Sequence, residues 1–341
     1  MKRRAFIRQS GVAAIGLTTL TSMAYSEPNV NSIKPKALKK GDTIAISAPA
    51  GAIFSSKYIK RFEEKLTGLG FKIIKGKTLS TQTGYLAGED DMRAKELNTF
   101  FADPEVKAIF TMRGGWGSNR ILDLLDYEMI KKNPKILMGY SDITSLILAI
   151  NKKTGLITYH GPMGYSSWEA FSTQQVYDTL IAGKKVVLKN PKEEEEQLET
   201  LHNGVAQGKL LGGNLTVVCS LIGSQYEPDW KGSILFLEET KEEPYRIDRL
   251  LWQMKLAGVF DKVNGIVLGS FYKCYALEPE RAFSLGEVFD QHFSKLNKPV
   301  YRGASFGHTI NKFTLPIGVL AKVDADKHII TLLENPTAFS G

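Results

Sequence analysis

The stretch KILMGYSDITSLILAI, residues 135–150, decides the fold of the first half of the chain. An apolar run over residues 136–138 stops at Gly139, and apolar residues then recur at helical spacing over residues 143–150. This pattern predicts a buried strand, a tight turn and an amphipathic helix, with Ser141 and Asp142 at the turn. A serine at such a junction is commonly a helix N-cap, although the same geometry exposes the hydroxyl of a catalytic nucleophile. Taken alone, the junction favours the N-cap.

Short apolar strands alternate with amphipathic helices on both sides of this stretch. The pattern predicts strands at 43–48, 71–74, 106–112 and 156–160, and helices at 57–69, 91–101 and 119–125. Such alternation indicates a parallel sheet with helices on both faces. Three loops, at 49–51, 113–117 and 139–142, each follow a strand. Because ligands bind at the carboxyl ends of parallel strands, we expect these loops to meet at one edge of the sheet.

A charged segment, NPKEEEEQLETLHN at residues 190–203, separates this region from a second one. Its composition suits either a linker or a solvated surface helix. Beyond it the pattern predicts helices at 215–222, 244–256 and 285–296, strands at 234–237 and 265–269, and a hairpin of strands 319–323 and 328–332. A length of 341 residues suits two domains. We therefore predict a parallel-sheet domain over 33–190, a linker over 191–202 and a smaller C-terminal α/β domain over 203–341.

The first 26 residues have the composition of an export signal. Four basic residues precede a short, uncharged apolar stretch at 11–24, and small residues lie near its end. Arg3 and Arg4 resemble the twin-arginine signal. We expect residues 1–26 to be a cleaved signal peptide, which places the mature protein in the periplasm with no stable membrane anchor. The alternative is a retained amphipathic anchor.

Composition excludes several other classes of protein. The four basic residues of the signal supply half of the net charge of +8, and the remaining basic residues form no stripe that would indicate nucleic-acid binding. Gly115 and Gly117 match a dinucleotide fingerprint, but Arg120 replaces its third glycine, which argues against NAD. No His or Cys spacing is typical of zinc, so we expect neither a metal nor another cofactor. Cys219 and Cys274 are either a disulfide pair or two free thiols.

A nucleophilic serine requires a base and a group that orients the base. Histidines occur at positions 160, 202, 292, 308 and 328. Only His160 and His308 lie in glycine-containing loops after short apolar stretches, and for His160 a structural role is favoured over a contact to substrate. Glu238 ends the apolar run at 234–237, where an unpaired carboxylate is costly. Glu238 is therefore the candidate carboxylate.

Seven short blocks, taken together, resemble the LD-carboxypeptidase family of serine peptidases and its microcin-immunity relatives. In chain order they are Ser47-Ala48-Pro49, Arg113-Gly114-Gly115-Trp116-Gly117, Gly139-Tyr140-Ser141-Asp142-Ile143-Thr144, His160-Gly161-Pro162-Met163, Gly212-Gly213-Asn214-Leu215, Leu237-Glu238-Glu239 with Pro244-Tyr245-Arg246-Ile247-Asp248-Arg249, and Gly307-His308. Each block is weak alone, but their order and their span over nearly the whole mature chain are specific. The resemblance implies a flavodoxin- or glutamine-amidotransferase-like N-terminal domain.

The resemblance also implies roles for individual residues. Ser141 corresponds to the nucleophile, Glu238 to the orienting carboxylate and His308 to the base. The backbone N–H groups of Gly115 and Asp142 correspond to the oxyanion hole. Two departures stand out: Trp116 replaces a frequent tyrosine, and Glu239 replaces a common aspartate, which leaves open which glutamate orients the histidine. Asn214 and Arg246 are candidates to bind substrate, and each is equally a helix-terminus residue.

What the resemblance implies for function is cleavage of the L,D-peptide bond to the terminal D-Ala of peptidoglycan tetrapeptides by a Ser–Glu–His triad. The partner would be a muropeptide, and the family suggests a homodimer. Two alternatives remain. One is hydrolysis of a peptidyl-nucleotide antibiotic of the microcin type. The other is an inactive exported protein that binds muropeptides.

Overall fold

A computed structural model describes residues 32–182 and 185–338. The predicted signal peptide at 1–26 lies outside the described residues. Within the two described ranges, no helix has both the length and the apolar character needed to cross a membrane.

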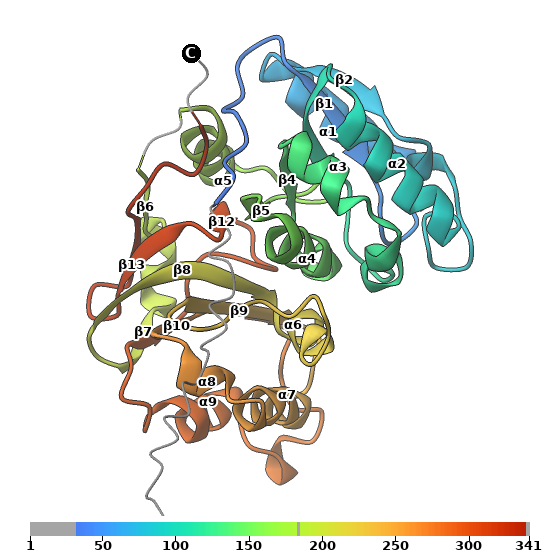
Figure 1. Ribbon diagram of the computed structural model, residues 1–341. Coiled ribbons are helices and arrows are strands. Elements are labelled where there is room, and N and C mark those ends of the chain that lie inside the picture. Colours follow the sequence, from blue (N-terminus) through green and yellow to red (C-terminus); the bar gives the residue numbers. More distant parts are fainter. Residues whose placement is uncertain (1–31, 183–184, 339–341) are drawn as a thin grey trace, which may run out of the picture. The chain divides into compact units, whose positions relative to one another are not determined.

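The first sheet has the strand order β12-β5-β4-β3-β1-β2 (Figure 1). Its strands are β1 (Thr43–Ser47), β2 (Lys72–Lys75), β3 (Val106–Thr111), β4 (Ile136–Gly139), β5 (Thr158–His160) and β12 (Leu315–Ile317). All neighbouring pairs are parallel except β12 with β5, which is antiparallel. The residues of β4 are all buried, as a central strand covered on both faces requires. The predicted parallel sheet is confirmed.

Helices pack around this sheet. They are α1 (Ser56–Gly68), α2 (Asp90–Ala102), α3 (Tyr127–Lys132), α4 (Thr144–Thr154) and α5 (Ala170–Val176), which continues as a π-helical turn (Tyr177–Ile181). The bounds of α1, α2 and α4 follow the predicted periodicity closely, whereas α3 and α5 were not predicted. The helix predicted at 119–125 is instead a 3-10 helix, Ser118–Leu124. Strand β12 was not predicted, and it comes from the C-terminal part of the chain.

The second sheet is mixed, with the strand order β6-β14-β13-β8-β9-β10-β11-β7. Its strands are β6 (Val187–Leu188), β7 (Glu199–His202), β8 (Val205–Asn214), β9 (Ile234–Thr240), β10 (Gly265–Tyr272), β11 (Val300–Arg302), β13 (Leu320–Asp324) and β14 (Ile329–Leu332). Strands β8 to β11 are parallel to one another, whereas the others join antiparallel. The β13–β14 hairpin matches its prediction.

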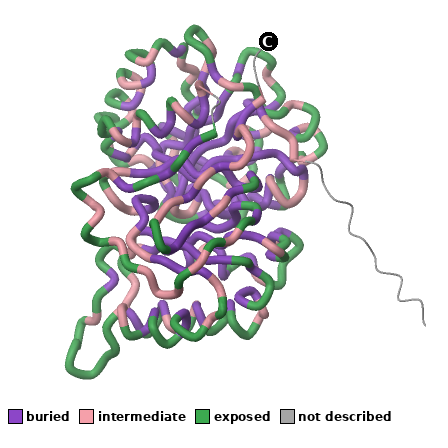
Figure 2. The backbone as a smooth tube through the Cα atoms, turned by 90° about the vertical axis from the view of Figure 1, so that its left-hand side faces the viewer, coloured by how far each residue is buried: buried purple, intermediate pink, exposed green. Residues whose placement is uncertain are grey.

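Helices α6 (Leu215–Leu221), α7 (Pro244–Leu256), α8 (Val259–Lys262) and α9 (Leu285–Phe293) gather along one side of the second sheet (Figure 1). The bounds of α7 agree with the prediction at both ends, because Pro244 occupies its first turn, where the missing N–H has no partner to lose. Together the two sheets and their helices confirm the predicted α/β class. Figure 2 shows that buried residues follow the interior strands, whereas exposed residues follow the outer loops and helices.

The charged segment predicted as a linker, 191–202, forms regular structure. It contains a 3-10 helix (Lys192–Gln197) and then β7, which pairs antiparallel with β11 at the edge of the second sheet. Charged side chains suit an edge strand because one of its sides faces water. Glu194 also accepts hydrogen bonds from Ser305 Oγ (2.6 Å) and Asn311 Nδ2 (2.8 Å). The segment therefore supports the loop that carries His308, and the boundaries of the domains stay a prediction.

The two sheets meet where α4 packs against β8 and α6. The Oγ1 atom of Thr144 accepts a hydrogen bond from Asn214 N (3.1 Å). A Cβ atom on Gly213 would lie 2.5 Å from the Thr144 side chain, so this close approach requires glycine. The end of β8 is thereby held against Thr144, which lies three residues after Ser141 in the chain.

Candidate active site

Ser141 lies on a strained turn between β4 and α4. Its φ angle is +62°, a left-handed value that is costly for a residue with a side chain. The serine does not cap the helix: its side chain makes no capping hydrogen bond, and the residues flanking the helical turns are Tyr140 and Ile143. The structure therefore favours the exposed-nucleophile geometry over the N-cap interpretation.

The loop after β3 lies directly against this turn. A Cβ atom on Gly114 would be 2.9 Å from Asp142 N and 3.0 Å from Ser141 Oγ, so only glycine allows the two backbones to approach. Gly51 N donates to Gly114 O (3.0 Å), which adds the loop after β1. The three loops thus meet at one edge of the sheet, as predicted.

Two backbone N–H groups are available beside Ser141. Neither Gly115 nor Asp142 donates its N–H to another residue in the described part of the chain. The Asp142 carboxylate instead accepts a hydrogen bond from Ser118 N (2.8 Å), which fixes the start of the 3-10 helix. Burial raises the pKa of Asp142, and this hydrogen bond opposes the rise. The side chain of Asp142 is therefore structural, and its backbone N–H is free to bind an anion.

Glu238 lies near the end of β9 and is fully buried. Its Oε2 atom is 2.6 Å from His308 Nδ1. Burial acts to raise the pKa of Glu238, but the neighbouring His308 outweighs it and holds that pKa below its usual value. A carboxylate that stays ionised beside Nδ1 fixes the tautomer and orientation of the imidazole.

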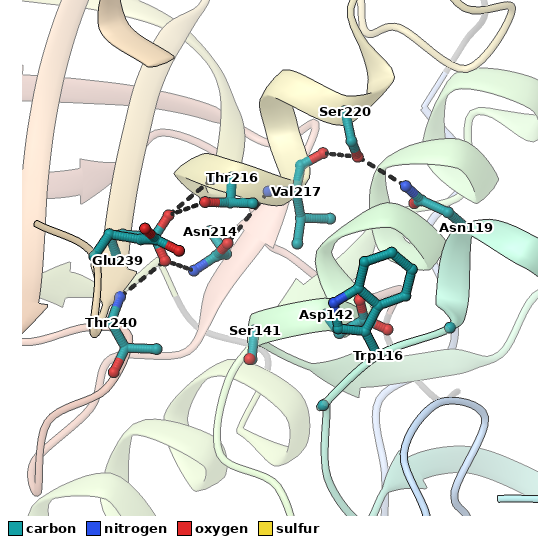
Figure 3. A pocket seen from close by; sticks show the side chains of 13 residues that line it. Trp116, Asn119, Ser141, Asp142, Asn214, Thr216, Val217, Ser220, Glu239 and Thr240 are labelled. Atoms are coloured by element: carbon teal, nitrogen blue, oxygen red, sulfur yellow. Dashed lines mark hydrogen bonds between the residues drawn. The ribbon is translucent and has the colours of Figure 1, made fainter. Parts of the chain in front are cut away.

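Glu239, the next residue, binds a different set of partners because successive strand side chains point to opposite faces. It accepts hydrogen bonds from Asn214 Nδ2 (2.8 Å), from the backbone and hydroxyl of Thr216 (2.8 and 2.7 Å) and from Thr240 N (2.9 Å) (Figure 3). Burial and the adjacent Glu238 raise the pKa of Glu239. The question left open by the sequence is thus answered: Glu238, and not Glu239, contacts His308.

His308 is held from three sides in the loop after β11. A Cβ atom on Gly307, whose φ is +86°, would lie 2.5 Å from the Glu238 side chain. Ser270 Oγ donates to His308 O (3.2 Å). The Tyr140 ring packs edge-on against the imidazole, with centroids 5.0 Å apart. Because Tyr140 precedes Ser141, the turn that carries Ser141 also positions the histidine.

Ser141 borders two cavities. The larger, about 650 Å³, is also lined by His308, Arg113, Tyr140 and Lys312. The smaller, about 220 Å³, is lined by Gly115, Trp116, Asn119, Asp142, Asn214 and Glu239, among others. Figure 3 shows Ser141 between the Asn214–Glu239 pair and the Trp116 ring. Ser141 therefore has a separate open space on each of two sides.

Other residues singled out in the sequence lie elsewhere. Arg246 lines neither cavity and pairs with Glu242 at the surface. His160 is buried among aromatic rings, its two ring nitrogens have no hydrogen-bond partner among the described residues, and burial lowers its pKa to about 4. Cys219 and Cys274 are free, buried thiols. No cluster of three or more His, Cys, Asp or Glu side chains in the described ranges is arranged to hold a metal ion.

Sequence reasoning missed Arg93 on α2. Its side chain is fully buried and donates to Pro49 O, Gly117 O (3.0 Å) and Gly88 O (3.3 Å), and it pairs with Asp90. One guanidinium therefore joins the loops after β1 and β3. Nothing in the sequence indicates this role, because a charged residue in a helix is usually solvated.

Comparison with known proteins yields one consistent family. The model of the LD-carboxypeptidase N-terminal domain matches residues 44–161, and that of the LD-carboxypeptidase C-terminal domain matches residues 207–323. A probable murein peptide carboxypeptidase of Bacillus subtilis is 39% identical over 295 residues, covering 85% of this chain and 91% of the relative. The murein tetrapeptide carboxypeptidase of Pseudomonas aeruginosa is 30% identical and covers 83% and 94%.

Solved structures give the same result. The microcin C7 self-immunity protein MccF in complex with glutamyl sulfamoyl guanosine has a TM-score of 0.82 at 28% identity, and the match covers 89% of this chain and 99% of that one. The muramoyltetrapeptide carboxypeptidase of Oxalobacter formigenes has a TM-score of 0.74 at 29% identity, covering 85% and 97%.

Proposed function

We infer the function of this chain from one premise: it belongs to the LD-carboxypeptidase family. We propose that it is a serine carboxypeptidase that removes the terminal D-Ala from peptidoglycan tetrapeptides. The observation that carries the proposal is the 2.6 Å contact between Glu238 and His308 beside a strained serine that borders the same cavity. The names of relatives that act on murein peptides support the substrate class.

In the proposed mechanism Ser141 Oγ attacks the carbonyl carbon of the scissile bond, and His308 Nε2 accepts the hydroxyl proton. The carbonyl oxygen becomes an oxyanion, which the N–H groups of Gly115 and Asp142 stabilise. His308 then gives its proton to the leaving nitrogen, and D-Ala departs. A water molecule, deprotonated by the same imidazole, hydrolyses the ester on Ser141 and releases the tripeptide.

Two further features belong to this proposal. The composition of residues 1–26 supports export, so that trimming of the cell wall takes place in the periplasm. We also propose that the protein acts as a homodimer, as the family resemblance suggests.

Mass spectrometry of muropeptide digests tests the proposal directly. The wild-type protein should convert tetrapeptides to tripeptides with release of one D-Ala each, and Ser141→Ala should leave the tetrapeptide intact. Ser80→Ala, an exposed serine whose hydroxyl bonds only its local backbone, is the matched control and should retain turnover. Undiminished turnover by Ser141→Ala contradicts the mechanism.

The second candidate function is hydrolysis of an aminoacyl-nucleotide antibiotic. It is favoured by the similarity to MccF, whose structures include complexes with glutamyl sulfamoyl guanosine and aspartyl sulfamoyl adenosine. Parallel assays with a tetrapeptide and an aminoacyl sulfamoyl nucleoside separate the two, because the better substrate has the larger kcat/KM.

The third alternative, an inactive muropeptide-binding protein, conflicts with the presence of Ser141, Glu238 and His308 in one site. A serine-directed phosphonylating reagent distinguishes it. Absence of an adduct on Ser141, with muropeptide binding retained, would favour a binding protein.

A further inference from the structure

Lys312 is a buried cation in the larger cavity. Only 4% of the surface of Lys312 is exposed, and Lys312 lines the cavity together with Ser141 and His308. The Nζ atom donates to Thr309 O and lies 5.5 Å from the centre of the Tyr140 ring. The residue is fixed by its backbone, because Lys312 N donates to Ser172 Oγ (2.9 Å).

No ion pair neutralises this ammonium within the described ranges. One carbonyl oxygen and one aromatic ring replace only part of the water that an ammonium binds in solution, so burial there is costly. Burial lowers the pKa of Lys312 to about 8, and the more distant Glu238 and Glu194 oppose that fall. The side chain therefore remains mostly protonated at neutral pH and is available to an anionic ligand.

Charge is distributed unequally on the two sides of Ser141. The larger cavity is lined by three basic residues, Arg113, Lys241 and Lys312, and by no Asp or Glu among the described residues. The smaller cavity is lined by Asp142, Glu239 and Glu242, and by no Lys or Arg in the same part of the chain. An anionic part of the substrate is therefore attracted to the larger cavity and repelled from the smaller one.

The leaving group also belongs in the larger cavity. His308 must reach the leaving nitrogen to protonate it, and His308 lines the larger cavity but not the smaller. In a carboxypeptidase the leaving group is a single amino acid with a free carboxylate. When this amino acid forms one hydrogen bond at its amide nitrogen and one at its carboxylate, the two protein atoms that bind it are about 9 Å apart. The His308 ring centre and Lys312 Nζ lie 5.0 and 5.5 Å from the centre of the Tyr140 ring, so both groups are close to the same ring of this cavity.

Of the three cations, Lys312 is the one suited to the carboxylate. Arg113 Nη1 is bound to Ala52 O (2.9 Å), and its guanidinium lies over the rings of Phe54 and Tyr165. Lys241 is exposed, so water weakens its interaction with any anion. Lys312 is already desolvated, and its attraction to an anion is correspondingly stronger.

We propose that Lys312 Nζ binds the terminal carboxylate of the substrate and so selects substrates that end in a free acid. This inference rests on the proposed carboxypeptidase function. The terminal residue of the substrate, which is released, then binds in the larger cavity. The part of the substrate on the acyl side of the scissile bond binds in the smaller cavity.

The test uses two peptides that differ only in their last group, a tetrapeptide ending in D-Ala and the same peptide ending in D-Ala amide. For the wild-type protein, kcat/KM should be higher for the acid. Lys312→Met should lower kcat/KM for the acid about 10- to 100-fold, the range for loss of a hydrogen bond to a charged group. Its effect on the amide should be less than about threefold.

Three further variants complete the experiment. Lys312→Arg keeps the charge and should retain the preference for the acid, whereas Lys295→Met, an exposed lysine outside both cavities, should leave both rates unchanged. Lys241→Met should change the acid-to-amide ratio less than about threefold, because exposed charges contribute little. Loss of the preference in Lys241→Met, with Lys312→Met unaffected, would overturn the assignment to Lys312.

Binding measured by calorimetry in the Ser141→Ala background separates recognition from catalysis. Ser141→Ala should bind the acid more tightly than the amide, and the double variant Ser141→Ala/Lys312→Met should bind both equally. If Lys312→Met weakens binding of the acid and the amide equally, this inference is overturned and the proposed function is unaffected. A wild-type protein that releases neither D-Ala nor D-Ala amide overturns the proposed function, and this inference with it.

Discussion

Glu238 Oε2 and His308 Nδ1 lie 2.6 Å apart although 70 residues separate them in the chain. Glu238 comes from a central strand, and His308 from a loop that folds back over that strand. The adjacent Glu239 binds Asn214, Thr216 and Thr240 instead. Two neighbouring carboxylates therefore have separate partners: Glu238 contacts His308, and Glu239 contacts Thr240 and the residues at the start of α6.

This division predicts different effects for two similar substitutions. Glu238→Gln should lower kcat by a factor of about 10² to 10⁴, because an amide no longer stabilises the imidazolium and can favour the wrong tautomer. Glu239→Gln should reduce kcat far less and act mainly on stability, since the lost hydrogen bonds are structural. Steady-state kinetics and chemical denaturation measure the two effects. Equal losses of kcat would contradict the division.

Gly307 provides a test of how His308 is positioned. Gly307→Ala should destabilise the protein by at least about 1 kcal/mol, because its φ of +86° disfavours any Cβ atom and that atom would collide with Glu238. We also expect kcat to fall, since the collision displaces the carboxylate from the imidazole. Gly286→Ala is the control: its Cβ atom meets nothing closer than 3.5 Å, and alanine suits its position in α9. If Gly307→Ala has the same free energy of unfolding as the wild type, the close packing of Gly307 against Glu238 is refuted.

His160 predicts a pH dependence of stability. Its folded-state pKa is about 4, below its usual value of 6.5, chiefly because of burial. Between these values the unfolded chain binds a proton that the folded protein does not, so the free energy of unfolding falls as pH decreases. The loss at pH 4 is about 3 kcal/mol. His160→Phe, which keeps an aromatic ring, should flatten this part of the profile.

The profile is measured by urea denaturation at a series of pH values between 4 and 7. His202→Gln serves as the control because its ring is partly exposed and bonds only to the neighbouring Asn203 O. A profile for His160→Phe that runs parallel to the wild type would assign the acid sensitivity to other groups.

Arg93 joins two of the three loops that meet at Ser141. Arg93→Met should lower the free energy of unfolding by about 3 kcal/mol, because Asp90 loses a buried partner and two loop carbonyls lose their donor. Turnover should fall as well, since Gly117 ends the loop that supplies Gly115. Arg120→Met is the matched control: Arg120 also pairs with Asp90, but it is exposed and contacts neither carbonyl. Similar unfolding curves for the two variants would refute the role of Arg93.

Much of the fold was predictable from the sequence because apolar periodicity is a local property. Strands β1 to β4 and helices α1, α2, α4 and α7 follow directly from spacing. Strand β8 was missed because Gly208, Gly212 and Gly213 interrupt its apolar pattern where other backbone approaches closely. Strand β7 was missed because its segment has the composition of a linker, and its pairing with β11 depends on residues about 100 positions away.

The candidate site was predictable only in part. Ser141 at a strand–helix junction and Glu238 at the end of an apolar strand are visible locally, and the choice of His308 over His160 depended on the family resemblance. Lys312 and Arg93 were not predictable, because a buried cation and a solvated one have the same signature in a sequence. Only the tertiary contacts of each distinguish them.

The outer position next to β5 is occupied by residues 315–317. During synthesis on the ribosome, the sheet that carries Ser141 therefore gains its last strand only when almost the entire polypeptide has emerged. Truncated products that end before residue 308 lack both the partner of β5 and His308. Assembly of the proposed site is thereby coupled to the near-completion of translation.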